Sequence, residues 1–185
     1  MNHPGKIIST FLSASISLSC LIASGQDPQP VNIGAGTTVD STEAIILKIR
    51  KEYTRIKTDS AKFRVVQQDV MDESTEGGEI VRYFDGEHLI KMVSTFFGET
   101  GNMVSEYYFS AGNLFFCYQR LTIYTKPMSG IALKVVENRY YLDNLKLIRW
   151  LKSNGKIADK TLYIAKRKEL MEELTRLLSL KPESP

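Results

Sequence analysis

Three segments of the chain repeat one pattern of apolar and polar positions in the same register. Each places a Tyr six residues before a Leu, with a bulky apolar residue after the Tyr and then four mostly polar, turn-forming residues. The segments are RYFDGEHLIKM (82–92), YYFSAGNLFFC (107–117) and YYLDNLKLIRW (140–150). A strand, a short polar turn and a second strand fit this pattern, so each segment predicts a β-hairpin.

The strand LFFCY (114–118) is apolar on both faces, so we expect it inside the sheet and covered on both sides. The third repeat is the ambiguous one, because its turn DNLK has no glycine. Residues 143–152 also fit a short helix capped by Asp143. The match in register to the other two repeats favours a strand.

Two helices are predicted around the hairpins. Asp40 and Glu43 have the spacing of a capping box, which would begin a helix there. Its apolar stripe consists of Ile45, Ile46, Ile49, Tyr53 and Ile56. A second helix is predicted over about Asp159 to Leu180, with a stripe formed by Tyr163, Leu170, Leu174 and Leu177 and widened by Met171 and Leu178. The pattern predicts an α+β fold, an antiparallel meander of about six or seven strands flanked by an N-terminal and a C-terminal helix.

The first 25 residues have the layout of a secretory signal peptide. Lys6 precedes an uncharged stretch that ends in the small residues Ala23-Ser24-Gly25. We therefore expect residues 1–25 to be removed and the protein to be exported, to the periplasm or the outside of the cell. Residues 26–38 read as a flexible leader, 39–181 as a single α+β domain and 182–185 as a tail. An alternative is a lipoprotein tethered to the membrane through lipidated Cys20.

Charge and cysteine content exclude several classes of function. The formal net charge of the 185 residues is +3, with acids and bases interspersed, so nucleic acid is not an expected partner. After residues 1–25 are removed, Cys117 is the one remaining cysteine. A dyad of Cys117 with His88 is rejected, because the thiol lies in the most apolar strand and His88 lies in a turn. One Cys and one His do not make a zinc site, and no cofactor motif is present.

The enriched residue is tyrosine, with nine in the chain. Adjacent tyrosines on a strand point to opposite faces, and two interpretations remain open. The rings pack in the core, or they form an exposed ladder that stacks on glycan rings or on the apolar residues of a partner protein in the envelope. The candidate partner-binding residues are Tyr107, Tyr108, Tyr140 and Tyr141, with Arg82, Glu106 and Arg139 supplying hydrogen bonds.

A hydrolase that uses two carboxylates from Glu99, Glu106 and Glu137 is a further alternative. The sequence contains no recognisable catalytic arrangement, and we therefore expect a protein that is not an enzyme.

The repeats, together with GETGN (98–102) before EYYF (106–109), resemble small uncharacterised exported proteins of Bacteroidota-type bacteria. The repeated hairpins over about residues 79–151 are also similar to MORN-like repeats, although Gly86 and Gly112 are not at equivalent positions and the third copy has no glycine. The resemblance implies a hairpin-repeat scaffold in an envelope protein. We expect an exported binding or interaction module of the bacterial cell envelope.

Overall fold

The chain divides into two units, Met1–Gly34 and Ala35–Pro185. The computed structural model describes residues 37–71 and 73–180, all within the second unit. The predicted signal peptide, Cys20 and the tail at 182–185 therefore lie outside the described residues, as does the leader except for its last two positions.

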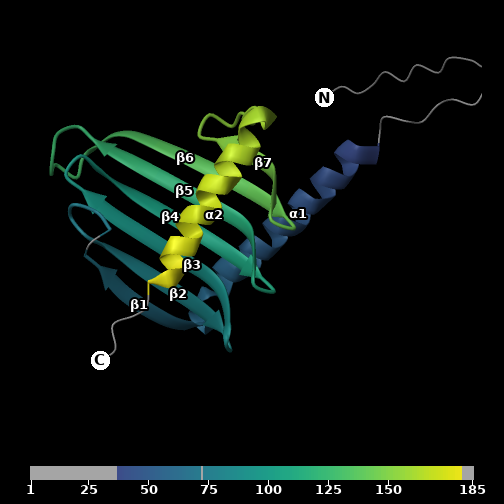
Figure 1. Ribbon diagram of the computed structural model, residues 1–185, viewed down its shortest axis with the longest axis horizontal. Helices are drawn as coiled ribbons and strands as arrows, with labels where there is room; N and C mark the ends of the chain where they lie inside the picture. Colours follow the sequence, from purple (N-terminus) through teal and green to yellow (C-terminus); the bar gives the residue numbers. More distant parts are fainter. Residues whose placement is uncertain (1–36, 72, 181–185) are drawn as a thin grey trace, which may run out of the picture. The chain divides into compact units, whose positions relative to one another are not determined.

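Seven strands and two α-helices make up the described part. The strands are β1 Arg64–Val70, β2 Gly78–Asp85, β3 His88–Gly98, β4 Gly101–Ser110, β5 Asn113–Tyr124, β6 Ala132–Asp143 and β7 Lys146–Lys152. The helices are α1 Thr37–Thr58 and α2 Tyr163–Ser179, with 3-10 turns at Ser60–Lys62 and Lys160–Leu162. Each strand pairs antiparallel with the next, in the order β1 to β7. The helices lie on opposite faces of this sheet (Figure 1). The predicted α+β meander is confirmed.

The sequence repeat is also a structural repeat. The hairpins β2–β3, β4–β5 and β6–β7 each shift register by one residue directly after the repeated Tyr, which is Tyr83, Tyr108 or Tyr141. All three of these rings pack on the α1 side of the sheet, whereas the repeated leucines pack on the α2 side. Equivalent positions therefore have equivalent environments.

The third hairpin forms its turn without glycine. Asn144 and Leu145 both adopt a positive φ, 46° and 62°, which is the backbone of the two-residue turn that joins twisted strands. The carbonyl of Leu145 accepts a hydrogen bond from Nε of Arg167 on α2 at 2.5 Å, and Leu147 is buried. Residues 146–152 form β7, so the strand prediction is confirmed and the helix alternative is wrong.

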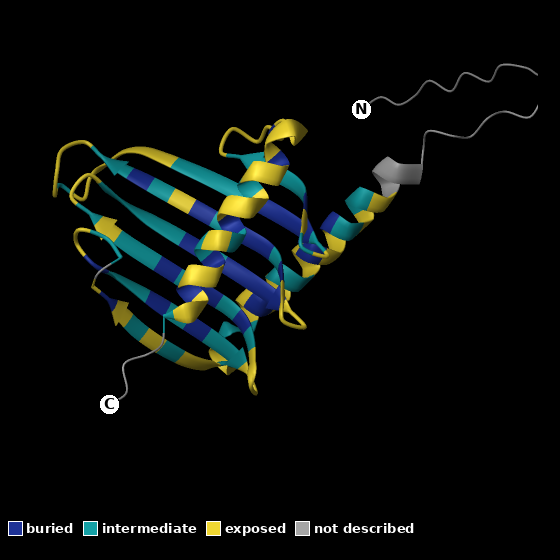
Figure 2. Ribbon diagram, viewed as in Figure 1, coloured by how far each residue is buried: buried dark blue, intermediate teal, exposed yellow. Residues whose placement is uncertain are grey.

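Two apolar cores lie on the two faces of the sheet. Tyr163, Leu170, Leu174 and Leu177 of the predicted stripe of α2 pack on one face with Met171 beside them, whereas Leu178 is exposed and its predicted place in the stripe is wrong. Ile46, Ile49 and Ile56 of α1 pack on the other face. Figure 2 shows buried residues along the strands that pass beneath α2. In β5, Phe116 belongs to the α1 core and Cys117 to the α2 core. The prediction that this strand is covered on both sides is confirmed.

The start of α1 differs from its prediction. The helix begins at Thr37, three residues before Asp40, so Asp40 lies inside the helix rather than at its cap. Glu43 forms an ion pair and hydrogen bonds with Arg149 of β7. The capping-box prediction is wrong because the helix begins before Asp40. Glu43 has its partner on the sheet instead, which sequence spacing along the helix does not reveal.

Candidate ligand-binding groove

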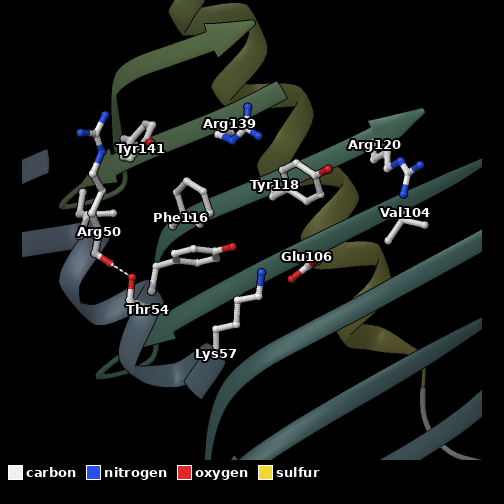
Figure 3. A pocket seen from close by; sticks show the side chains of 12 residues that line it. Arg50, Thr54, Lys57, Val104, Glu106, Phe116, Tyr118, Arg120, Arg139 and Tyr141 are labelled. Atoms are coloured by element: carbon white, nitrogen blue, oxygen red, sulfur yellow. Dashed lines mark hydrogen bonds between the residues drawn. The ribbon is translucent and has the colours of Figure 1, made fainter. Parts of the chain in front are cut away.

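A groove with a volume of about 530 Å³ lies in the angle between α1 and strands β4 to β6 (Figure 3). We call it the α1 groove. Its α1 side consists of Ile49, Arg50, Tyr53, Thr54 and Lys57, and its sheet side of Val104, Glu106, Phe116, Tyr118, Arg120, Arg139 and Tyr141. The α1 residues recur at helical spacing, and the sheet residues alternate along each strand, so each set shares one face of its element.

Aromatic rings form the inner wall of the α1 groove. The ring of Tyr53 lies 5.0 Å from that of Tyr108 and 5.0 Å from that of Phe116, between centroids. Phe116 in turn lies 5.1 Å from Tyr141. Such inclined contacts are favourable arrangements for aromatic pairs. The wall is therefore formed by side chains that hold one another in place.

The two carboxylates beside this wall are already occupied by neighbouring side chains. Glu106 accepts a hydrogen bond from the hydroxyl of Tyr108 at 2.5 Å and pairs with Lys91 at 3.1 Å. Glu137 accepts from the hydroxyl of Tyr118 at 2.8 Å and from Arg139 at 3.0 Å.

These contacts shift the ionisation of the groups involved. Burial, followed by the hydrogen bond to Glu137, raises the pKa of Tyr118 to about 12. The hydrogen bond from Tyr118 and the charge of Arg139 lower the pKa of Glu137. Both changes favour a neutral phenol that donates to an ionised carboxylate.

Three cations of the lining form no ion pair within the described residues, although the charges of Arg50 and Arg120 help to lower the pKa of Glu43 and of Glu137 respectively. Within residues 37–71 and 73–180, Arg50, Lys57 and Arg120 form no ion pair. Arg50 lies over the ring of Tyr141 at 5.8 Å, and Lys57 over the ring of Tyr53 at 5.9 Å. Figure 3 shows Arg120 beside Val104, at the opposite end of the groove from Arg50. The α1 groove is therefore positively charged.

All four predicted tyrosines are buried. Tyr107 and Tyr108 are 0% exposed, Tyr140 is 1% and Tyr141 is 4% exposed. The exposed aromatic ladder is wrong, because a helix covers each face of the sheet and so each member of a pair meets a helix. Tyr108 and Tyr141 belong to the α1 core, whereas Tyr107 and Tyr140 belong to the α2 core.

The three predicted polar residues do not form one set. Glu106 and Arg139 line the α1 groove. Arg82 is buried on the α2 side, where it donates to the carbonyls of Leu177 at 3.1 Å and Leu180 at 2.7 Å. These are terminal carbonyls of a helix, which lack partners within it. Arg82 thus binds the end of α2.

Sequence reasoning missed the helical side of the groove and four residues of its sheet side, Val104, Phe116, Tyr118 and Arg120. One signal for the helix was available, because Arg50, Thr54 and Lys57 recur at spacings of four and three along one edge of the apolar stripe. Nothing in the spacing indicates which side of the stripe faces an open part of the sheet.

The remaining candidate chemistry is separated in space. His88 is exposed at the start of β3, and Cys117 is buried in the α2 core. Burial raises the pKa of the Cys117 thiol well above its ordinary value. Across the described residues, His, Cys, Asp and Glu side chains form no group of three or more placed to hold a metal ion. No helix in the described ranges has the length and apolar character needed to cross a membrane.

Comparisons with protein-family models, with curated proteins and with solved structures each find no match to this chain.

Proposed function

We propose that this protein is an exported, non-enzymatic binding module of the cell envelope, and that the α1 groove takes a small molecule with a ring or another apolar body. The observation that supports this most strongly is the aromatic wall formed by Tyr53, Phe116 and Tyr141 inside a groove of about 530 Å³. Pockets for small molecules typically combine an apolar lining with a few polar groups, and this composition matches the α1 groove.

Binding is better supported than hydrolysis. A hydrolytic pair needs one carboxyl that holds a proton near neutral pH. Of the three candidates, Glu106 and Glu137 are bound by a tyrosine hydroxyl and a cation, and the pKa of Glu137 is lowered. Glu99 is exposed in the turn between β3 and β4. These contacts favour a structural role for Glu106 and Glu137 in the groove over a role in proton transfer.

Export rests on the sequence of residues 1–25, and the tethered lipoprotein remains its alternative. Mass spectrometry of the protein from its own envelope distinguishes them. A mature chain that begins at Gln26 supports the soluble form, and a diacylated Cys20 supports the lipoprotein. We still expect the partner to be an envelope protein or a glycan. The four buried tyrosines do not form an exposed ladder for it to bind.

The binding proposal is tested by screening small ring compounds against the protein by ligand-observed NMR. Val104→Trp and Thr54→Trp each place an indole in the groove, and we expect either to abolish binding. Ile164→Trp is the control, because Ile164 is 84% exposed on α2 and does not line the groove. Circular dichroism checks that each variant is folded. Failure of every compound to bind, or equal binding by all three folded variants, would contradict the proposal.

A further inference from the structure

Resting on that proposed function, we propose that the ligand of the α1 groove is an anion, a small molecule with an apolar body and a carboxylate or phosphate group, and that Arg120 binds this group. In the lining of the groove, charged groups and apolar groups occupy different parts of the surface. Aromatic rings form the wall, and cations extend from α1 to β5 along the groove.

The charge of the groove favours an anion over a cation. Four cations, Arg50, Lys57, Arg120 and Arg139, stand against one carboxylate, Glu106, in the lining. That carboxylate is engaged by Lys91 and by the hydroxyl of Tyr108. A cationic ligand would therefore compete with Lys91 for its counterion. An anion instead meets Arg50, Lys57 and Arg120, none of which forms an ion pair within the described residues.

Among these cations, Arg120 is the one best placed to bind a ligand. Arg139 is paired with Glu137, and Arg50 and Lys57 each lie over a tyrosine ring. Within the described part of the chain, Arg120 has neither an ion pair nor a ring contact. Glu137 lies opposite it on β6, where the charge of Arg120 helps to lower the pKa of that carboxylate. A guanidinium binds carboxylate or phosphate through two parallel hydrogen bonds. Arg50 and Lys57 add positive potential along the helical edge.

The size of the groove favours a free molecule over a membrane surface. About 530 Å³ is within the range for small-molecule pockets. The aromatic wall runs into the angle behind α1, where Tyr108 and Phe116 are buried. A flat array of headgroups cannot reach this wall, whereas a single amphipathic anion fits along it.

Two dyes with the same aromatic body test the charge preference. 1-Anilinonaphthalene-8-sulfonate carries an anionic group, and N-phenyl-1-naphthylamine lacks it. We expect the full chain to bind the anionic dye about tenfold more tightly, as one charged hydrogen-bonded contact would give. Arg120→Met should remove most of that preference without weakening the neutral dye. The control is Lys134→Met, which removes an exposed cation of β6 outside the groove.

The outcomes of the dye experiment distinguish a failure of the anion proposal from a failure of the proposed binding function. Equal affinity for the two dyes, or an unchanged preference in a folded Arg120→Met, overturns the anion proposal and leaves the binding module standing. Binding of neither dye counts against both. The anionic group could belong to a free small molecule or to a membrane lipid. Competition by decanoate and decyl phosphate, compared with competition by phosphatidylglycerol vesicles, separates these two sources. Displacement of the anionic dye by the soluble anions supports the proposal, and displacement by vesicles alone overturns it in favour of a membrane surface.

Discussion

Tyr53 of α1 lies edge-on to Tyr108 of β4, with ring centroids 5.0 Å apart and ring planes inclined by 69°. This contact connects a helix to a strand more than fifty positions away in the sequence. It buries Tyr108, a member of the sequence repeat, and places Tyr53 in the wall of the α1 groove. Core packing and the candidate binding surface therefore share one side chain.

Replacing Tyr53 with alanine should weaken both properties. Removing a partly buried ring leaves Tyr108 and Phe116 without a neighbour, and we expect a loss of about 2 kcal/mol in the free energy of unfolding. Urea denaturation measures this loss, and dye binding should fall in the same variant. Tyr53→Phe keeps the ring and should stay within about 0.5 kcal/mol of the wild type. An equal loss in both variants would show that the hydroxyl, rather than the ring, matters.

Arg82→Met should loosen the C-terminal end of α2. The substitution keeps an apolar side chain but leaves the carbonyls of Leu177 and Leu180 without their donor, at a cost of about 2 kcal/mol. Hydrogen exchange should rise in the last turns of α2 and stay unchanged in α1. A uniform rise across both helices would contradict the assigned role and indicate global destabilisation.

Glu173 of α2 should make stability depend on pH. Its side chain lies over the sheet, where it accepts a hydrogen bond from Gln119 at 3.1 Å. Burial is the largest cause and raises its pKa above the ordinary value of 4.5; nearby Glu169 also raises it, whereas Tyr107, Gln119 and Lys166 lower it. The folded state therefore favours the protonated form more than the unfolded state does. Its contribution to stability is present below about pH 4.5 and is lost as the pH rises through the raised pKa.

Glu173→Gln removes this titration. We expect it to raise the thermal midpoint at pH 8 and to change it less at pH 4, as measured by circular dichroism. The matched control is Glu172→Gln, because Glu172 is its exposed neighbour. A pH-independent effect of Glu173→Gln would contradict the assignment of this pH dependence to Glu173.

Cys117 should be inert in the folded protein. It is 0% exposed, and burial raises the pKa of its thiol, which suppresses the reactive thiolate. A chromogenic disulfide reagent should react with the thiol only as the protein unfolds, with a rate that follows the urea transition. Rapid labelling of the native protein would contradict this placement of the side chain.

Two glycines that face each other across the β3–β4 turn should respond differently to alanine. A Cβ on Gly101 would collide with the carbonyl oxygen of Thr122, whereas on Gly98 its nearest neighbour would lie at an ordinary 3.5 Å. We expect Gly101→Ala to cost about 3 kcal/mol, because the obstacle is backbone. Gly98→Ala serves as the control and should cost much less in the same urea titration.

Much of the fold was predictable because its elements carry local periodic signals. The repeat predicted three hairpins, and the spacing of Tyr163, Leu170, Leu174 and Leu177 predicted the buried face of α2. The capping box failed because α1 begins at Thr37, before Asp40, and Glu43 binds Arg149, 106 positions away, instead. A local pattern does not report such a distant partner.

The candidate site was predictable only in part. Of the seven residues selected from sequence, Glu106, Arg139 and Tyr141 line the α1 groove, and the ring of Tyr108 lies behind its wall. Tyr107 and Tyr140 lie in the α2 core, and Arg82 binds the end of α2. Alternation along a strand shows that adjacent residues face opposite ways, but it does not indicate what covers each face.

The sequence by itself determined the hairpins, their order and the buried stripe of each helix, because these depend on interactions between residues close in the chain. The apolar strand 114–118 also predicted cover on both of its faces, but only the tertiary structure decided that this cover buries every tyrosine of the two adjacent pairs. It also decided where α1 crosses the strands. That crossing leaves an open angle beside the helix, and it brings Arg50 and Lys57 to the same groove as Arg120.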